Sequence, residues 1–212
     1  MNATRLIVIR HGETAWNVDT RIQGHQDIAL NTIGLRQADQ VAHALRDETV
    51  DAIYASDLQR AWQTARAIAQ TTHAPLSAEL GLRERHFGSF EGQTYAELET
   101  RFPEDSLRWR RREPDWAPPA GESLRTMRER ISSIASRLAQ QHMGGQIVLV
   151  AHGGVLDQLY RLATRQDLQA PRTWVLGNAT INRLLWTPEG FTLVGWSDTQ
   201  HLKDANMDEN SV

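Results

Sequence analysis

The chain has 212 residues, the length of one domain of ordinary size, and 40% of them are hydrophobic, which is enough to form a full core. Its formal net charge of −3 gives no reason to expect nucleic acid or an anionic membrane as a partner. Because the chain contains no cysteine, disulfides, zinc–thiolate sites, iron–sulfur clusters and cysteine nucleophiles are excluded.

No segment of the sequence looks like a membrane anchor or an export signal. No apolar stretch approaches the roughly 20 residues that a helix needs to span a bilayer. The first residues do not combine a basic region with a long apolar one, so no secretory signal is expected. The prediction is a cytoplasmic protein without a membrane partner.

Helical and extended patterns alternate in the first half of the chain. The predicted elements are a strand over 4–10, a polar loop to about 31, a helix over 35–45, a strand over 52–55 and a helix over 58–69. Asn31 or Thr32 can cap the first helix, and the second is expected to begin near Ser56-Asp57.

The second half contains longer elements and one irregular stretch. The predicted order is a short strand over 76–80, a glycine-punctuated loop over 81–93, a helix over 94–101, an irregular stretch over 102–123, a helix over 124–138, a strand over 146–151, a helix over 153–163 and strands over 180–186 and 191–196. Ser123 is the expected cap of the long helix, which ends at Gly144-Gly145. A turn at Pro188-Glu189-Gly190 joins the last two strands.

This alternation of strands and helices predicts an α/β fold, a three-layer sandwich with a mainly parallel central sheet flanked by helices. Residues 1–197 are expected to form a single domain, in which residues 94–122 are a cap segment over the site. Residues 198–212 are interpreted as a polar C-terminal tail that frays.

Two histidines follow buried strands that are far apart in the sequence. His11 comes directly after the strand that ends at Arg10, and His152 comes directly after the strand over 146–151. Open α/β sheets bind ligands beyond the carboxyl ends of their strands, so both rings should enter one crevice. With arginines around it, such a pair suits phosphoryl transfer through a phosphohistidine.

A phosphate monoester mainly needs a site that positions it and neutralises its oxygens. The chain has no pair of closely spaced aspartates at a strand end, so no metal and no other cofactor is expected. It offers Arg10 beside His11, and Arg60 near the start of a helix, where the helix terminus also favours an anion. A neutral imidazole can be the nucleophile, and Glu13 and Glu84 both remain candidates for the acid that protonates the leaving oxygen.

Blocks of sequence across nearly the whole chain resemble one known family. They are Leu6–Asn17, Gln23-Gly24 followed by Leu30 and Gly34, Ser56–Ala61, Leu82–Gly92, Gly121–Leu124 and Val150–Gly154. In this order and spacing they are similar to the histidine phosphatase superfamily, in the branch that also contains cofactor-dependent phosphoglycerate mutases. The resemblance implies a phosphoglycerate mutase-like fold.

The resemblance also implies a role for each matching residue. His11 is the phosphorylated nucleophile, and Glu84 rather than Glu13 is the general acid and base. The implied phosphate-binding residues are Arg10, Asn17, Arg60 and His152. The implied substrate-binding residues are Gln23, Gly24, Arg85, Arg110, Arg111 and Gly153.

The sequence leaves two alternatives for the reaction, a phosphoglycerate mutase and a phosphatase. Glu84–Gly88 and Trp109-Arg110-Arg111 resemble mutase segments. Mutases, however, carry a longer insertion between their proline pair, here Pro118-Pro119, and the helix that begins at Ser123. A shortened cap admits water, which hydrolyses the phosphohistidine, so a phosphatase is favoured over a mutase.

A hypothesis of another class is a module that binds phosphorylated ligands without turnover. Such a module would usually lose His11 or Glu84, and both are present. The expected partner is a small-molecule phosphoester, and the exposed parts of the last two strands leave a homodimer possible.

Overall fold

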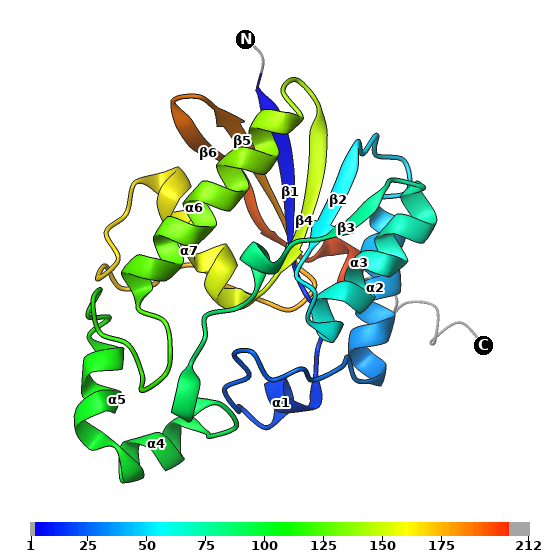
Figure 1. Ribbon diagram of the computed structural model, residues 1–212. Helices are drawn as coiled ribbons and strands as arrows, with labels where there is room; N and C mark the ends of the chain where they lie inside the picture. Colours follow the sequence, from blue (N-terminus) through cyan, green and yellow to red (C-terminus); the bar gives the residue numbers. More distant parts are fainter. Residues whose placement is uncertain (1–2, 204–212) are drawn as a thin grey trace.

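The computed structural model describes residues 3–203, which form a six-stranded sheet flanked by helices (Figure 1). The strands are β1 (Thr4–Arg10), β2 (Ala52–Ala55), β3 (Leu76–Ala78), β4 (Gln146–Ala151), β5 (Ile181–Thr187) and β6 (Gly190–Asp198). Their order across the sheet is β3-β2-β4-β1-β5-β6, and the first four run parallel while β5 and β6 are antiparallel. The predicted α/β fold with a mainly parallel sheet is confirmed.

Among residues 3–203, the five helices over 32–44, 59–72, 95–101, 124–141 and 153–164 lie close to the predicted positions, and the other three were not predicted. In chain order the helices are α1 (Ala15–Val18), α2 (Thr32–Ala44), α3 (Gln59–Thr72), α4 (Tyr95–Arg101), α5 (Pro103–Arg110), α6 (Leu124–Gln141), α7 (Gly153–Thr164) and α8 (Gln200–Lys203). The side chains of Asn31 and Ser123 accept hydrogen bonds from the backbone at the starts of α2 and α6, as predicted. α3 starts later than expected, because Asp57 binds Arg83 and the N-cap position is Leu58, which has no capping side chain. The Asp27 Oδ1 atom accepts from Gln59 N at 2.6 Å instead.

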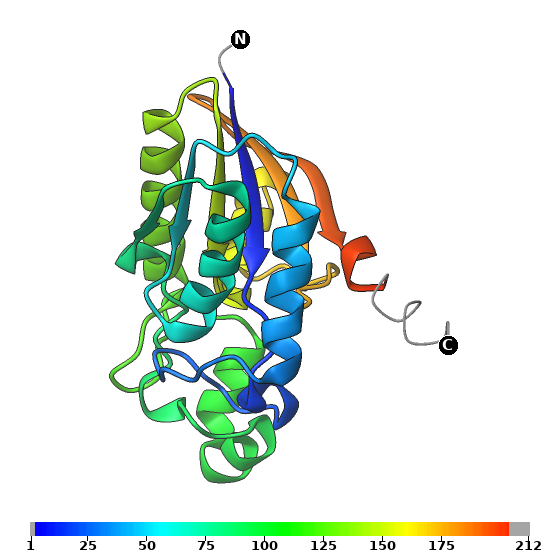
Figure 2. The same cartoon turned by 90° about the vertical axis from the view of Figure 1, so that its right-hand side faces the viewer.

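Two apolar clusters lie between the sheet and the helices, one on each face of the sheet. Leu6 and Val8 of β1 pack on the side of α6 and α7, whereas Ile7 and Ile9 pack on the side of α2 and α3. This alternation follows from the two-residue repeat of a strand, and both faces are apolar because both are covered. Figure 2 shows α6 and α2 on opposite sides of the strands, which confirms the three-layer sandwich.

The stretch over 102–123, predicted to be irregular, contains the helix α5. Pro103 lies at its first turn with Glu104 and Asp105, all of which suit a helix N-terminus. The prediction was wrong because α5 lacks a clear apolar stripe that would reveal it in the sequence. Trp109 of α5 packs against the small core that includes Phe90 and Trp116. In Figure 1, α4 and α5 lie beside one another away from the sheet.

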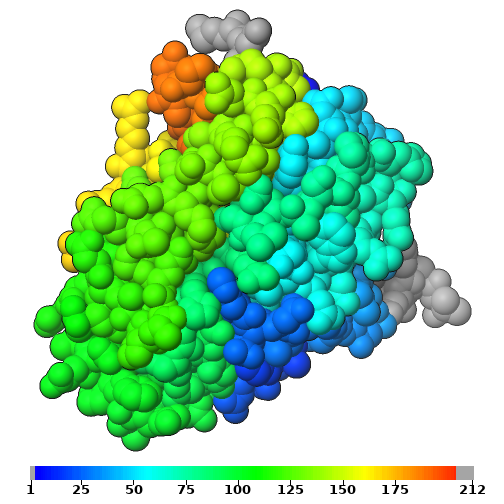
Figure 3. All heavy atoms as spheres, viewed as in Figure 1, coloured from blue at the N-terminus to red at the C-terminus, as the bar shows by residue number. Residues whose placement is uncertain are grey.

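The segment before α4 is joined to the loop that follows α1. Ile22 N donates to the Gln93 carbonyl at 3.0 Å, and Gly92 N donates to the Ile22 carbonyl at 2.8 Å. In the space-filling view of Figure 3, the loop after α1, coloured blue, lies against the green segment around α4. A small separate core of Ile22, Phe90, Leu98 and Trp116 lies beneath this contact. The proposed cap over 94–122 is thus fastened to the loop that carries Gln23 and Gly24.

The predicted polar tail over 198–212 starts with ordered residues. Asp198 is the last residue of β6, and Gln200–Lys203 form α8. Leu202 packs against the cluster on the side of α2 and α3, which holds this end of the chain in place. Residues 204–212 lie outside the described residues. None of the helices between residues 3 and 203 is both long and apolar enough to cross a membrane.

Candidate active site

The two predicted histidines meet at the carboxyl ends of neighbouring parallel strands. β1 and β4 pair in register, with Arg10 opposite Ala151, so the residues that follow are brought together. The ring centroids of His11 and His152 lie 5.2 Å apart. Both rings are buried, at 2% and 0% exposure. The two rings thus lie next to each other, as expected, and His11 lines the pocket described below.

The ring of His11 is held in one orientation by its own loop. Its Nδ1 lies 2.7 Å from the Gly12 carbonyl oxygen, which can only accept, so Nδ1 donates and Nε2 keeps its lone pair. Burial lowers the pKa of His11 well below its usual value, and the charges of Arg60 and Arg10 lower it further. The imidazole is therefore neutral at neutral pH.

The loop after β1 is pressed against the start of α2. A Cβ at Gly12 would lie 2.4 Å from the Gly34 carbonyl oxygen, so only glycine fits there. Gly12 N also donates to the Thr64 hydroxyl at 3.1 Å, which ties the loop to α3. These contacts fix the direction in which His11 leaves the strand.

Arg10 and Arg60 are each held in place by hydrogen bonds from terminal guanidinium nitrogens to backbone carbonyls. Arg10 Nη1 donates to Leu176, while Arg60 donates from Nη1 to the Gln26 carbonyl at 2.7 Å and from Nη2 to the Gly24 carbonyl at 2.8 Å. Burial lowers the pKa of Arg60 to about 10, so it stays charged at neutral pH. In residues 3–203 the buried Nε atoms of both arginines find no partner.

The ring of His152 adds two more unpartnered nitrogens to those of Arg10 and Arg60. Neither Nδ1 nor Nε2 of its fully buried ring has a hydrogen-bond partner within the described chain. Its pKa is lowered well below the usual value by burial and then by Arg60. Buried polar atoms are normally paired, so this group of unpaired nitrogens around His11 has the character of an anion site.

Glu84 lies in the connection between β3 and α4 and lines the same pocket as His11, Arg10 and Arg60. Its Oε1 accepts from Arg85 N at 2.8 Å, and its Oε2 accepts from Gly154 N at 3.0 Å. A Cβ at Gly154 would lie 2.2 Å from Glu84 Oε1, so glycine at this position lets the carboxylate approach α7. Glu84 also raises the pKa of the nearby Arg10 through its charge, although burial of Arg10 outweighs this effect.

These residues line a pocket of about 450 Å³. The predicted site residues that line it are Arg10, His11, Asn17, Gln23, Gly24, Arg60, Glu84, Arg85 and Gly153. Asn17 also closes a capping box with Thr14 at the start of α1, which fixes its side chain at the rim. Arg85 is buried among carbonyls and aromatic rings, and burial lowers its pKa to about 10.

Two predicted substrate-binding residues are placed elsewhere. Arg110 pairs with Glu99 at 2.6 Å on the surface and does not line this pocket. Arg111 ends α5 and does not line the pocket either. The chain then turns through Arg112, which has a φ of 53° and enters the pocket instead. The structure therefore places Arg110 and Arg111 outside this pocket, because the end of the helix decides which arginine turns inward.

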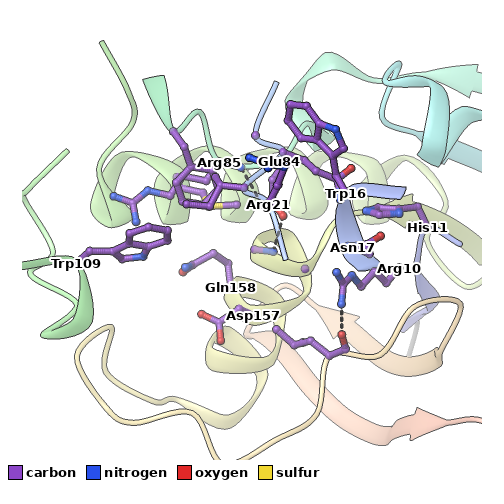
Figure 4. Close-up of a pocket in the computed structure, with 18 of the residues that line it drawn as sticks. Arg10, His11, Trp16, Asn17, Arg21, Glu84, Arg85, Trp109, Asp157 and Gln158 are labelled. Carbon is purple, nitrogen blue, oxygen red and sulfur yellow. Dashed lines mark hydrogen bonds between the residues drawn. The ribbon is translucent and has the colours of Figure 1, made fainter. Parts of the chain in front are cut away.

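The lining residues that were not predicted include Tyr95, Asp157, Gln158 and Arg172. Asp157, Gln158 and Trp109 lie across the pocket from His11 (Figure 4). Arg112, Arg172 and Tyr95 also line the pocket. Asp157 and Gln158 come one helical turn after Gly153 and Gly154, so helical spacing was a signal that could have found them. Arg172 lies in a loop for which the sequence offered no such signal. Within residues 3–203, no group of three His, Asp or Glu side chains is arranged to hold a metal ion.

A family model described as "Histidine phosphatase superfamily (branch 1)" matches residues 6–199. The chain belongs to this superfamily. Among its curated relatives, "Phosphoglycerate mutase-like protein 4" of Arabidopsis thaliana is 35% identical, and the match covers 95% of this chain and 88% of that protein. "Metal-independent phosphoserine phosphatase" of Arabidopsis thaliana is 36% identical, and the match covers 96% of this chain and 85% of that protein.

Solved structures of histidine phosphatases agree with this assignment. The phosphoserine phosphatase of Entamoeba histolytica in complex with 3-phosphoglyceric acid has a TM-score of 0.84 and 30% identity, and the match covers 94% of this chain and 99% of that one. The resemblance read from the sequence blocks is therefore confirmed at the level of family and fold.

Proposed function

We propose that this protein is a metal-independent phosphomonoester hydrolase that acts on small phosphorylated metabolites through a phosphohistidine on His11. The observation that carries the proposal is the free Nε2 lone pair of His11, which lies in a pocket beside unpartnered nitrogens of Arg10, Arg60 and His152. A neutral nucleophile and fixed cations are what phosphoryl transfer requires.

In the first step, His11 Nε2 attacks the phosphorus and the bond to the ester oxygen breaks. The charge on the equatorial phosphoryl oxygens is neutralised by Arg10 and Arg60, with the ring of His152 beside them. Glu84 gives its proton to the leaving oxygen, so the alcohol departs as a neutral molecule. The products are a phosphohistidine, a Glu84 carboxylate and the free alcohol.

In the second step, water attacks the phosphohistidine. The Glu84 carboxylate takes a proton from the water as its oxygen bonds to phosphorus, and the P–N bond breaks. The electron pair of that bond returns to His11 Nε2, which leaves inorganic phosphate and a neutral ring. The hydrogen bond from Nδ1 to the Gly12 carbonyl at 2.7 Å keeps the same tautomer throughout the cycle.

The alternative is a phosphoglycerate mutase with the same phosphohistidine. Two observations favour the phosphatase. Arg110 and Arg111, the residues that resembled a mutase carboxylate site, do not line the pocket. Only three residues, Ala120-Gly121-Glu122, separate Pro119 from the cap of α6. A short connection of this kind limits how far the site can be closed against water.

Turnover in a chelating buffer tests the proposal. We expect hydrolysis of p-nitrophenyl phosphate and of phosphorylated metabolites at the same rate with and without EDTA. With 3-phosphoglycerate and catalytic 2,3-bisphosphoglycerate, we expect inorganic phosphate to exceed 2-phosphoglycerate. Binding without turnover would support the non-catalytic module, and accumulation of 2-phosphoglycerate would support the mutase.

Glu84→Gln should depend strongly on the leaving group. We expect kcat/KM for an alkyl phosphate to fall by about 10²–10⁴-fold, because an alkoxide cannot leave without a proton. The loss with p-nitrophenyl phosphate should be much smaller, since p-nitrophenolate leaves readily unprotonated. The exposed Glu189, in the turn between β5 and β6, supplies the matched control Glu189→Gln. An equal loss on both substrates would remove Glu84 from the role of acid.

A further inference from the structure

The wall of the pocket opposite His11 is organised around one buried carboxylate. Asp157 is 2% exposed and contacts three arginines. Arg112 Nη2 and Arg161 Nε lie 2.8 and 3.0 Å from its Oδ2, and Arg172 Nε lies 3.1 Å from its Oδ1. Three guanidinium groups therefore share one carboxylate, which leaves an excess of positive charge at this end of the pocket.

The three arginines differ in how many of their N–H donors are still free to bind a ligand. Arg161 is fully buried and also donates to the carbonyls of Asp167 and Ala170, so its role is to hold the loop after α7. Arg172 uses only Nε, and its Nη1 and Nη2 donate to no group between residues 3 and 203. The guanidinium end of Arg172 is thus fixed in place at the pocket wall while two of its nitrogens stay available.

Gln158 is a second, independent sign of a missing partner. It is 1% exposed and lines the pocket, yet neither its Oε1 nor its Nε2 has a hydrogen-bond partner in the described part of the chain. A buried amide without partners is costly, and such groups are rare unless a ligand or water satisfies them. Figure 4 shows Gln158 between Trp109 on one side and Arg10 and His11 on the other.

We propose that Arg172, Arg112 and Gln158 form a carboxylate subsite, so that the preferred substrates are phosphomonoesters of small hydroxy acids. The planar fork of Arg172 matches the two oxygens of a carboxylate, and the Gln158 amide donates a further hydrogen bond. The proposal rests on the proposed phosphatase function and names its substrate class.

The spacing between Glu84 and Gln158 suits such a substrate. Gln158 lies four residues, about 6 Å along the helix axis, beyond Gly154, whose backbone N–H binds Glu84, the proposed acid at the ester oxygen. Two or three carbon atoms between the ester oxygen and the carboxylate bridge a gap of this size. The charge of Arg172 also contributes to lowering the pKa of Arg10, after burial, which agrees with a short separation.

A matched pair of substrates tests the subsite. 3-Phosphoglycerate and glycerol 3-phosphate share the phosphate and the three-carbon chain and differ in the carboxylate. We expect kcat/KM to favour 3-phosphoglycerate by about tenfold or more, and Arg172→Ala to reduce this preference by a similar factor, chiefly through KM. Gln158→Leu, which disturbs no ion pair, should reduce the preference by several-fold. Arg46→Ala, which removes an exposed charge just beyond the end of α2, is the control and should keep the preference.

Different results overturn the two proposals. If the wild type hydrolyses p-nitrophenyl phosphate but shows no preference for 3-phosphoglycerate, the carboxylate subsite is refuted and the phosphatase stands. The same holds if Arg172→Ala and Gln158→Leu leave the preference unchanged, which would assign the cluster around Asp157 to stability alone. If the wild type hydrolyses no phosphomonoester, the proposed function itself fails.

Discussion

His11→Ala should abolish turnover, with kcat reduced by about 10⁴-fold or more on every phosphomonoester. The ring combines a free Nε2 lone pair with a fixed direction, because the hydrogen bond to the Gly12 carbonyl holds its Nδ1. The loss should therefore not depend on the leaving group, in contrast to Glu84→Gln. The exposed histidine at position 43 of α2 provides the control, since His43→Ala should retain full activity.

Covalent labelling separates this result from simple misfolding. Brief incubation with phosphorus-labelled substrate and rapid quenching should give a label that is stable to base and lost in acid, as expected for a phosphoramidate. The His11→Ala protein should take up no label while its thermal unfolding stays cooperative. Full labelling of the variant would assign the nucleophile to another residue.

Arg60→Ala should be the second most damaging change, with kcat/KM reduced by about 10²–10⁴-fold. Two losses combine in this variant. The phosphoryl group loses a buried cation, and the carbonyls of Gly24 and Gln26 lose the donors that hold them at 2.8 and 2.7 Å. The loop with Gln23 should then be less well fixed, so both kcat and KM are expected to change.

Two further variants show which loss dominates. Arg60→Lys restores the charge without the planar fork, so it should recover only part of the activity. Arg66, which is exposed on the same helix, gives the matched control Arg66→Ala, expected to behave as the wild type. A near-normal kcat/KM for Arg60→Ala, measured by initial rates with an alkyl phosphate, would remove Arg60 from the phosphate site.

Residues that follow buried strands were the most predictable part of the site. The apolar runs of β1 and β4 are short, apolar on both faces and bounded by polar residues, which identifies parallel strands covered on both sides. Parallel neighbours end at the same edge of the sheet, so His11 and His152 could be placed together from the sequence alone. Caps with a local signal, Asn31 and Ser123, were predicted for the same reason.

The far wall of the pocket depends on contacts that local sequence does not encode. Arg112 reaches the pocket only because α5 ends at Arg110 and the next turn carries a left-handed residue. Arg172 is directed by its ion pair with Asp157, fifteen residues earlier in the chain. A run of arginines over 110–112 gives no indication of which member faces inward, and the resemblance to mutases singled out Arg110 and Arg111, which do not line this pocket.

A crystal structure with vanadate tests the central claim most directly. Vanadate adopts the trigonal bipyramidal geometry of a phosphoryl group in transfer, so its vanadium should lie within bonding distance of His11 Nε2. Its equatorial oxygens should contact the guanidinium groups of Arg10 and Arg60, and an apical oxygen should face Glu84. Vanadate bound elsewhere in the pocket, with the ring of His11 untouched, would contradict the phosphohistidine mechanism.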